Sequence, residues 1–233
     1  MRKSFIALAC AVASVLWTTS SFADEGRANT QPEFVSLFQV PWQCPAAPKI
    51  ACGGLAKPVL LELEQNTGIA EAWVNRAGTV LAVVGSDGNR ETRTNTVRTL
   101  LREIFEKDVA TELQGEARTT ELASFRSGAA WYRGAQVDAL SREEADIIAA
   151  RLVRRIQAKV ALSEDKARLM TASFADILKA RFIRSSDAPG RTGDQKPRNE
   201  QLRDVARAQL GAPGVSAFEE AIAKGERPAP GEK

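Results

Sequence analysis

A single proline, Pro58, constrains the fold most, because it stands near the start of an apolar stripe. Leu55, Val59 and Leu63 recur at every fourth position, and this spacing predicts an amphipathic helix. Proline is tolerated only in the first turn of a helix, since it has no backbone N–H and its ring clashes with the preceding turn. The helix therefore cannot begin much before Gly54 or Leu55, and Asn66-Thr67-Gly68 is expected to end it.

The residues in front of this helix are expected to form a strand and then a loop. Phe34–Val40 is rich in residues that favour strands, whereas residues 42–54 include Pro45, Pro48 and two glycines. Cys52 is therefore expected just ahead of the helix N-terminus. The positive end of the helix dipole would lower the pKa of this thiol and favour its thiolate.

Two strands are predicted after the helix, joined by a tight turn. They are Ile69–Asn75 and Thr79–Gly85, and the turn between them has Asn75 first and Gly78 last, which favours a hairpin. Val80–Val84 is apolar on both faces, so the second strand is expected in the centre of a sheet.

A second helix and a short closing strand complete the pattern. Apolar residues at helical spacing predict the helix; they are Val97, Leu100, Leu101, Ile104 and Phe105. The segment Val109–Ala117 is expected to be the strand. The order predicts an α+β fold, a ferredoxin-like βαββαβ sandwich over residues 34–118 with both helices on one face of a four-stranded sheet.

A different pattern begins near residue 138. Ser141 and Glu144 match a capping box ahead of one amphipathic helix, and a second helix is expected to run through Met170. The short connection between them predicts an antiparallel helical hairpin over residues 138–183. Residues 184–233 are rich in Gly, Pro and charged residues and are expected to be largely disordered or weakly helical.

Two smaller features belong to the same half of the chain. Arg151, Arg154 and Arg155 are expected to form a solvated basic face on the first helix of the hairpin. Trp131-Tyr132 could be a binding edge, but an aromatic pair in a connection more often anchors that connection onto a core.

The N-terminal residues are expected to be an export signal. Arg2 and Lys3 form a basic start, Phe5–Trp17 an apolar segment, and Ser21-Phe22-Ala23 a small-residue cleavage site. The apolar segment is too short to span a bilayer. The predicted signal peptide is residues 1–23, and the mature chain is expected in a bacterial periplasm without a membrane span.

Charge and residue types exclude several classes of function. Without Arg2 and Lys3 the chain has 30 basic and 29 acidic side chains, and such a balance argues against nucleic acid as a partner. The sequence contains no histidine, which excludes mechanisms that depend on imidazole and zinc sites ligated by His. We therefore expect a protein that is not an enzyme.

Two cysteines, Cys44 and Cys52, remain after Cys10 leaves with the signal. An even pair in an oxidising compartment favours a disulfide. The pair could instead hold a soft metal ion between two thiolates, or the two could be unrelated free thiols. The residues alone leave these three interpretations open.

The stretch C-G-G-L-A-K-P, Cys52–Pro58, resembles the metal loop of the heavy-metal-associated domain family, which includes copper chaperones and a periplasmic mercury-binding protein. Val59 and Leu63 match core positions of the family's first helix, and Gly68-Ile69 matches the turn after it. The resemblance covers roughly residues 34–117. It implies the βαββαβ fold and a site that binds Cu(I) or Hg(II) through two cysteines.

The chain departs from the family pattern at two positions. Leu55 stands where the family has its second cysteine, and Ile50 stands where it has a methionine. Cys44, eight residues before Cys52 in the same loop, is the candidate replacement. The predicted metal ligands are therefore Cys44 and Cys52.

These observations lead to three hypotheses. The first is an exported protein that binds or carries a soft heavy-metal ion such as copper or mercury through its loop cysteines. The second is an interaction module with a structural Cys44–Cys52 disulfide, in which the helical hairpin docks a protein partner. The third is a thiol–disulfide redox protein, which the absence of a C-x-x-C motif disfavours.

Overall fold

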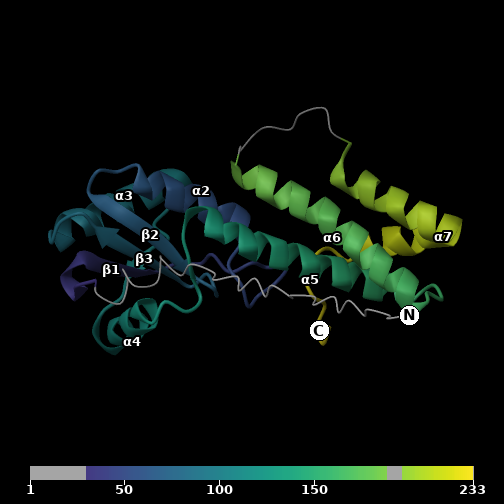
Figure 1. The fold of residues 1–233 in the computed structure, drawn as a ribbon, viewed down its shortest axis with the longest axis horizontal. Helices are drawn as coiled ribbons and strands as arrows, with labels where there is room; N and C mark the ends of the chain where they lie inside the picture. The colour runs from purple at the N-terminus through teal and green to yellow at the C-terminus, as the bar shows by residue number, and fades with distance from the viewer. Residues whose placement is uncertain (1–29, 188–195, 233) are drawn as a thin grey trace, which may run out of the picture.

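The computed structural model describes residues 30–187 and 196–232 of the 233-residue chain, with residues 184–187 described only as helical backbone. The expected signal peptide lies outside the described residues. In chain order the elements are η1 (Pro32–Phe34), β1 (Val35–Gln39), α2 (Gly53–Glu64), β2 (Ile69–Asn75), β3 (Val80–Gly85), α3 (Arg90–Phe105), β4 (Thr111–Glu112), α4 (Gly115–Arg126), β5 (Trp131–Tyr132), η2 (Gly134–Val137), α5 (Asp138–Gln157), α6 (Glu164–Asp187) and α7 (Arg198–Ala223). The sheet and α2–α4 lie at one end of the molecule, and α5–α7 at the other (Figure 1).

The five strands form one antiparallel sheet in the order β4-β1-β3-β2-β5. The central position predicted for the apolar strand is confirmed, since β3 lies between β1 and β2. The hairpin between β2 and β3 is confirmed as well. The N–H of Gly78 donates to the carbonyl of Asn75 at 2.9 Å, and Gly78 has a φ of +70°.

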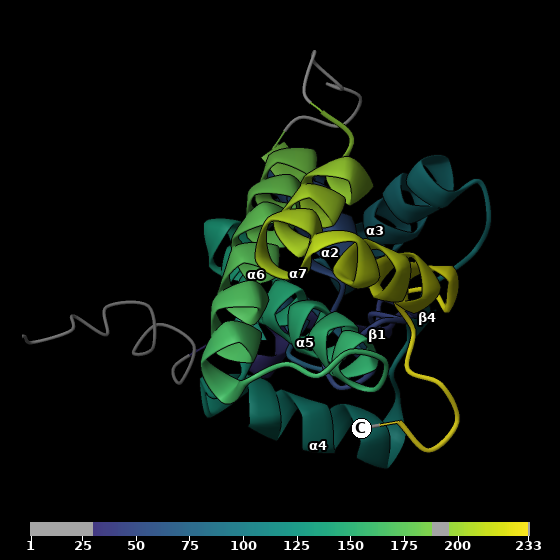
Figure 2. The ribbon, with the colours of Figure 1, turned by 90° about the vertical axis from the view of Figure 1, so that its right-hand side faces the viewer.

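Both faces of the sheet are covered. Leu60 of α2 and Val97 of α3 pack with Phe38 and Leu81 on one face, which confirms that these two helices share a face. The opposite face is covered by α4, and Figures 1 and 2 both place α3 and α4 on opposite sides of the sheet. The alternation of strand residues between two covered faces explains why β1 and β3 are buried almost throughout.

The predicted closing strand, Val109–Ala117, is wrong in its extent. Only Thr111–Glu112 pairs with β1, and α4 begins at Gly115, whose φ of +57° turns the chain away from the sheet. The helix α4 has no counterpart in the predicted pattern.

The aromatic pair that follows α4 anchors this connection onto the core. Trp131 of β5 is buried and pairs with Asn75 of β2. The ring of Phe125 in α4 packs between the rings of Trp73 and Trp131, with centroid separations of 6.1 Å and 5.2 Å. This is the structural role that such an aromatic pair more often has, rather than a binding edge.

The helices α5 and α6 fold back on each other, as the short connection predicts, and α7 packs against both (Figures 1 and 2). Phe174 of α6 and Phe218 of α7 meet at a ring-centroid distance of 6.0 Å. The core of these helices also contains Cys44 and Ile50 from the loop before α2. The helical part is therefore not an appendage, because its core is completed by a loop of the sheet region.

The last helix is more ordered than the sequence indicates. Residues 198–223 form α7, which is kinked at Gly211, and Leu202 and Phe218 on either side of the kink are buried. Residues 188–195, part of the segment expected to be disordered, lie outside the described residues.

The predicted capping box at Ser141 is wrong, because α5 begins at Asp138 and Ser141 lies inside the helix. The carboxylate of Asp138 accepts from the ammonium of Lys57 at 3.1 Å, a buried ion pair that joins the start of α5 to α2. The two helices approach closely beside this pair, since a Cβ on Gly53 would lie 2.0 Å from the hydroxyl oxygen of Ser141. None of the helices in the described residues is both long and apolar enough to cross a membrane.

Candidate functional site

The loop that carries both cysteines is a short paired structure. Gln43 and Ala51 form an antiparallel bridge; the N–H of Cys44 donates to the carbonyl of Ile50 at 2.9 Å, and the N–H of Cys52 donates to that of Trp42 at 2.8 Å. Cys44 is thus opposite Ile50 and Cys52 opposite Trp42. The Gln43–Ala51 pair lies between these two pairs, so the two cysteines are diagonal neighbours on one face of the loop, two pairs apart rather than directly opposed.

The turn between β2 and β3 holds this loop in place. The N–H of Trp42 donates to the carbonyl of Gly78 at 2.9 Å, and the N–H of Ala51 donates to that of Arg76 at 2.7 Å. The two ends of the loop are therefore fixed by the backbone of the most regular part of the sheet. The resemblance to a metal loop gives no indication of this support.

Cys44 is buried and its thiol is protonated at neutral pH. Its side chain is 1% exposed and its Sγ donates to Oε1 of Glu144 in α5 at 3.0 Å. Burial, followed by the hydrogen bond to Glu144 and the negative charge of that carboxylate, raises the pKa of Cys44 to about 12. Burial likewise raises the pKa of Glu144.

The expected activation of Cys52 is not found. Cys52 is the N-cap residue of α2, as predicted, and the backbone N–H groups of Gly54 and Leu55 do act to lower its pKa. Burial and the charge of Glu144 act in the opposite direction, and the net pKa of Cys52 is raised. Removal of the thiolate from water outweighs the helix N-terminus here, because the helical part of the chain covers the loop.

Both cysteines are free in the structure. Within residues 30–187 and 196–232, no cluster of three or more Cys, Asp or Glu side chains has the arrangement of a metal site. A metal bound here would therefore depend on the two thiols, as the sequence indicates. The carboxylate of Glu144 is the charged group that acts on both of them.

A cavity of about 570 Å³ opens beside Cys44 and Glu144. Its far wall is formed by the start of α7 and by residues 224–232, which we call the C-terminal strap. Arg198 of α7 pairs with Glu226 of the strap at 2.6 Å, and Lys224 and Arg227 also line the opening. Cys44 therefore lies in the wall of this cavity, although only 1% of the residue is exposed.

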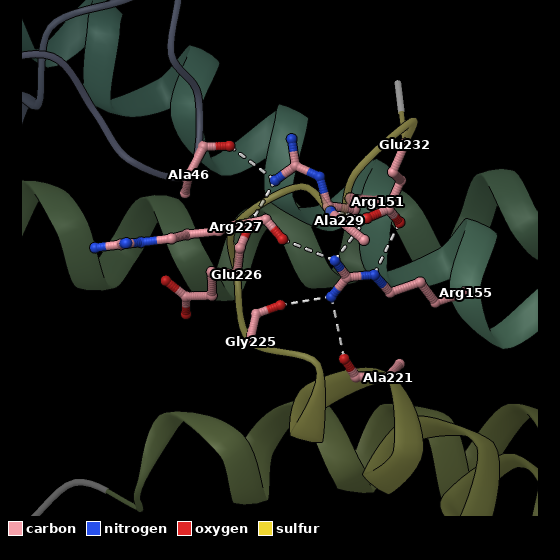
Figure 3. A network of polar contacts seen from close by, with 9 residues as sticks. All are labelled: Ala46, Arg151, Arg155, Ala221, Gly225, Glu226, Arg227, Ala229 and Glu232. Carbon is pink, nitrogen blue, oxygen red and sulfur yellow. Dashed lines mark hydrogen bonds and ion pairs between the residues drawn. The ribbon is translucent and has the colours of Figure 1, made fainter.

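Two buried arginines of α5 hold the strap, so the expected solvated basic face is wrong for both (Figure 3). Arg151 donates to the carbonyls of Ala46 in the cysteine loop and Glu226 in the strap, at 2.8 Å and 2.6 Å. One guanidinium thus joins the loop to the strap. Arg154, which lies between them in sequence, is exposed as expected.

Arg155 makes the larger set of contacts. Its Nε and Nη2 donate to the two carboxylate oxygens of Glu232 at 2.8 Å and 2.7 Å, in a bidentate pair. Its remaining donors reach backbone carbonyls of Ala221, Gly225 and Arg227. These arginines are buried because unpaired carbonyls at the end of α7 and in the strap supply the acceptors that a buried guanidinium needs.

Sequence reasoning missed three residues of this site. Glu144 was assigned to a cap, and Arg151 and Arg155 to a solvated face. A usable signal exists for the arginines, because positions 148, 151, 152, 155 and 156 lie on one helical stripe, where an arginine is flanked by buried apolar residues. No comparable signal places Glu144 against a cysteine 100 positions away.

Comparison with known proteins finds no family model that matches the chain, and no curated protein or solved structure that matches it. The likeness of Cys52–Pro58 to heavy-metal-associated domains therefore stays a prediction that depends on those residues.

Glu144→Gln is expected to speed alkylation of Cys44. The carboxylate raises the pKa of Cys44 by its hydrogen bond and its charge, and only the thiolate reacts. Each unit by which the pKa falls increases the thiolate fraction about tenfold at a pH below the pKa. Labelling with iodoacetamide between pH 8 and 10, followed by peptide mass spectrometry, measures the rate for each cysteine.

Asp146→Asn on the same helix is the control, since its carboxylate is half exposed and pairs with Lys179 away from the thiols. Equal labelling rates in the two variants would show that Glu144 has no influence on Cys44.

Proposed function

We propose that the chain is an exported periplasmic protein that binds a soft, thiophilic metal ion such as Cu(I) or Hg(II) through Cys44 and Cys52. The observation that carries the proposal is the paired loop, which places two free thiols diagonally across one intervening pair, with Cys44 in the wall of an open cavity. Soft ions prefer thiolates to the oxygen ligands that dominate the rest of the surface.

The surroundings of the thiols favour such an ion over harder ones. Both thiols are largely shielded from water and each must lose its proton when a metal binds, so binding releases protons and strengthens as the pH rises. Only an ion with very high affinity for thiolate competes with protons at such sites. The Sγ–Glu144 contact gives the released proton of Cys44 an acceptor at 3.0 Å.

The proposal includes a ferredoxin-like fold for the first half of the chain. Its support is the strand order β4-β1-β3-β2 with α2 and α3 together on one face, which is the arrangement that a split βαβ unit produces. Strand β5 and helix α4 are additions to that unit. The helices α5–α7 then act as a cover that encloses the cysteine loop.

Titration of the reduced mature chain tests the function. One equivalent of Cu(I) or Hg(II) is expected to bind, observed by native mass spectrometry and by the ultraviolet thiolate-to-metal absorption. Cys44→Ser and Cys52→Ser are each expected to abolish stoichiometric binding, while circular dichroism shows that each variant is folded. No binding by the reduced wild-type chain, or full binding by both variants, would refute the proposal.

A count of free thiols before any reductant is added distinguishes the metal site from the alternative, a structural disulfide. Two reactive thiols in the denatured, unreduced protein support a metal site ready for loading. None would favour the interaction module with a Cys44–Cys52 disulfide.

A further inference from the structure

We propose that the groove between α2 and α3 is a docking site for a basic amphipathic helix of a partner protein. The groove has a volume of about 300 Å³ and is lined by residues of α2 and α3, some of which also contact the core between these helices and the sheet. It is a different part of the surface from the cavity beside Cys44, and its lining shares no residue with that cavity.

The floor and walls of the groove are apolar. They are formed by Leu55, Pro58, Val59, Leu100 and Ile104. Ile104 is 41% exposed, one of three large apolar side chains in the described residues that are exposed to this degree. Val59 is buried in the core that these helices form with the sheet, and Leu55 and Leu100 are partly buried against that core. The groove is therefore an opening at the edge of the core, with Ile104 exposed beside it.

The charge at the rim indicates the kind of partner. Glu62 on α2 and Glu103 on α3 line the groove, and the lining contains no Lys or Arg. Glu62 accepts only a hydrogen bond from the amide of Gln65 at 3.3 Å, and neither carboxylate has an ion pair within the part of the chain that the structure describes. A segment with an apolar face bordered by Lys or Arg complements both features.

The dimensions of the groove suit a helix or short segment rather than a large interface. About 300 Å³ holds one or two side chains, far fewer than the roughly 20–30 residues that each partner contributes to a stable interface of standard size. Apolar side chains at helical spacing that enter a groove between two helices are an established mode of peptide recognition. We therefore expect a weak and reversible contact.

The position of the groove places a docked partner next to the cysteine loop. Gly54 and Leu55 line its end and belong to the first turn of α2, directly after Cys52. The docking proposal does not require metal at Cys52. If both hold, the partner's segment lies beside the less buried of the two thiols.

Fluorescence anisotropy with a labelled peptide tests the proposal. The probe is a helical peptide with leucine on one face and lysine on the other, and two matched peptides carry glutamate in place of lysine or the same residues in scrambled order. The mature chain is expected to bind the leucine–lysine peptide at least about tenfold more tightly than either matched peptide, and added salt should weaken the binding.

Variants locate the site. Ile104→Asp and the double variant Glu62→Lys with Glu103→Lys are each expected to weaken binding roughly tenfold. Leu169→Asp on α6 is the control, because Leu169 is 60% exposed and lies outside the groove. Equal binding of all three peptides, or an equal loss with Leu169→Asp, would overturn the proposal.

Sedimentation velocity of the chain alone tests whether a second copy of the chain occupies the groove. The proposal expects a monomer whose sedimentation coefficient is the same with Ile104→Asp. A dimer that Ile104→Asp dissociates would assign the groove to self-association and would overturn the docking of a basic helix. Neither result bears on Cu(I) binding, so failure here is distinguishable from failure of the metal proposal.

Discussion

Arg155→Met is expected to lower the free energy of unfolding by about 3–5 kcal/mol, the cost of breaking a buried charged pair. The Arg155 side chain is 4% exposed, and its guanidinium donates to the carboxylate of Glu232 and to three backbone carbonyls. Methionine fills a similar volume but donates no hydrogen bond. The carbonyls of Ala221 and Arg227 would then lack their buried donor, so the strap would separate from α5. Urea denaturation followed by far-ultraviolet circular dichroism measures the loss.

Two variants separate the charge from the packing. Arg154→Met removes a neighbouring arginine that is exposed, and it should change stability by less than about 0.5 kcal/mol. Glu232→Gln keeps most of the shape while it removes the negative charge, and about 1–2 kcal/mol is expected because Arg155 retains its carbonyl acceptors. A loss for Arg154→Met as large as that for Arg155→Met would contradict the structural role of the strap.

The bidentate pair also makes the strap sensitive to acid. The hydrogen bonds from Arg155 hold the pKa of Glu232 at about 2, below its ordinary value of 4.5. Because the folded-state pKa is depressed, the contribution of this carboxylate is complete above pH 4.5 and is lost as the pH falls toward 2. The protection factors of residues 224–232 against hydrogen exchange, which correct for the intrinsic effect of pH, are expected to fall over this range in the wild-type chain and to depend less on pH in Glu232→Gln.

The sheet region could be predicted because local rules and tertiary packing agree there. Pro58 predicts the start of α2 to within two residues, although the helix begins at Gly53 and Pro58 therefore lies in its second turn rather than its first. The Asn75–Gly78 turn predicts the β2–β3 hairpin. Because Val80–Val84 is apolar on both faces, it is expected at the centre of the sheet, where the structure has it. The prediction of the closing strand fails at β4, because a strand of two residues is too short to show an alternation of apolar and polar residues in the sequence.

The helical part could be predicted only as far as its periodicity. The hairpin of α5 and α6 follows from apolar spacing, but α7 contains Gly211 and Pro213, which signal a break although each half of the helix is buried. The burial of Arg155 depends on carbonyls some 70 positions away along the chain. A pattern read along the sequence contains no information about such a partner.

The cysteine loop shows how tertiary packing reverses a local rule. Position at a helix N-terminus favours the thiolate of Cys52, and this effect is present in the structure. It is outweighed because α5 brings Glu144 and an apolar core onto the loop. The sequence therefore draws attention to the two cysteines but not to Glu144 beside them, and it gives the wrong direction for the pKa of Cys52.

Gly78→Ala is expected to destabilise the chain by about 2–5 kcal/mol, from two costs that act together. The φ of +70° at Gly78 costs an L-residue about 1–2 kcal/mol. An added Cβ would also lie 2.6 Å from the carbonyl oxygen of Trp42 and 2.8 Å from the Cα of Ala51, and backbone atoms cannot rotate away as a side chain can. Relief of this overlap displaces the cysteine loop from the turn, which adds the cost of overpacking, typically about 1–3 kcal/mol.

Gly115→Ala provides the matched control for this prediction. Gly115 has a φ of +57° but nothing within 4 Å of its added Cβ, so it reports the conformational cost alone. The excess loss in Gly78→Ala measures the close approach of the loop, and it should coincide with faster alkylation of Cys44 as the loop moves away from α5. Equal losses in the two variants, with unchanged labelling of Cys44, would show that the turn does not hold the cysteine loop. An excess loss with unchanged labelling would instead show that Cys44 is held by Glu144 and the helices alone.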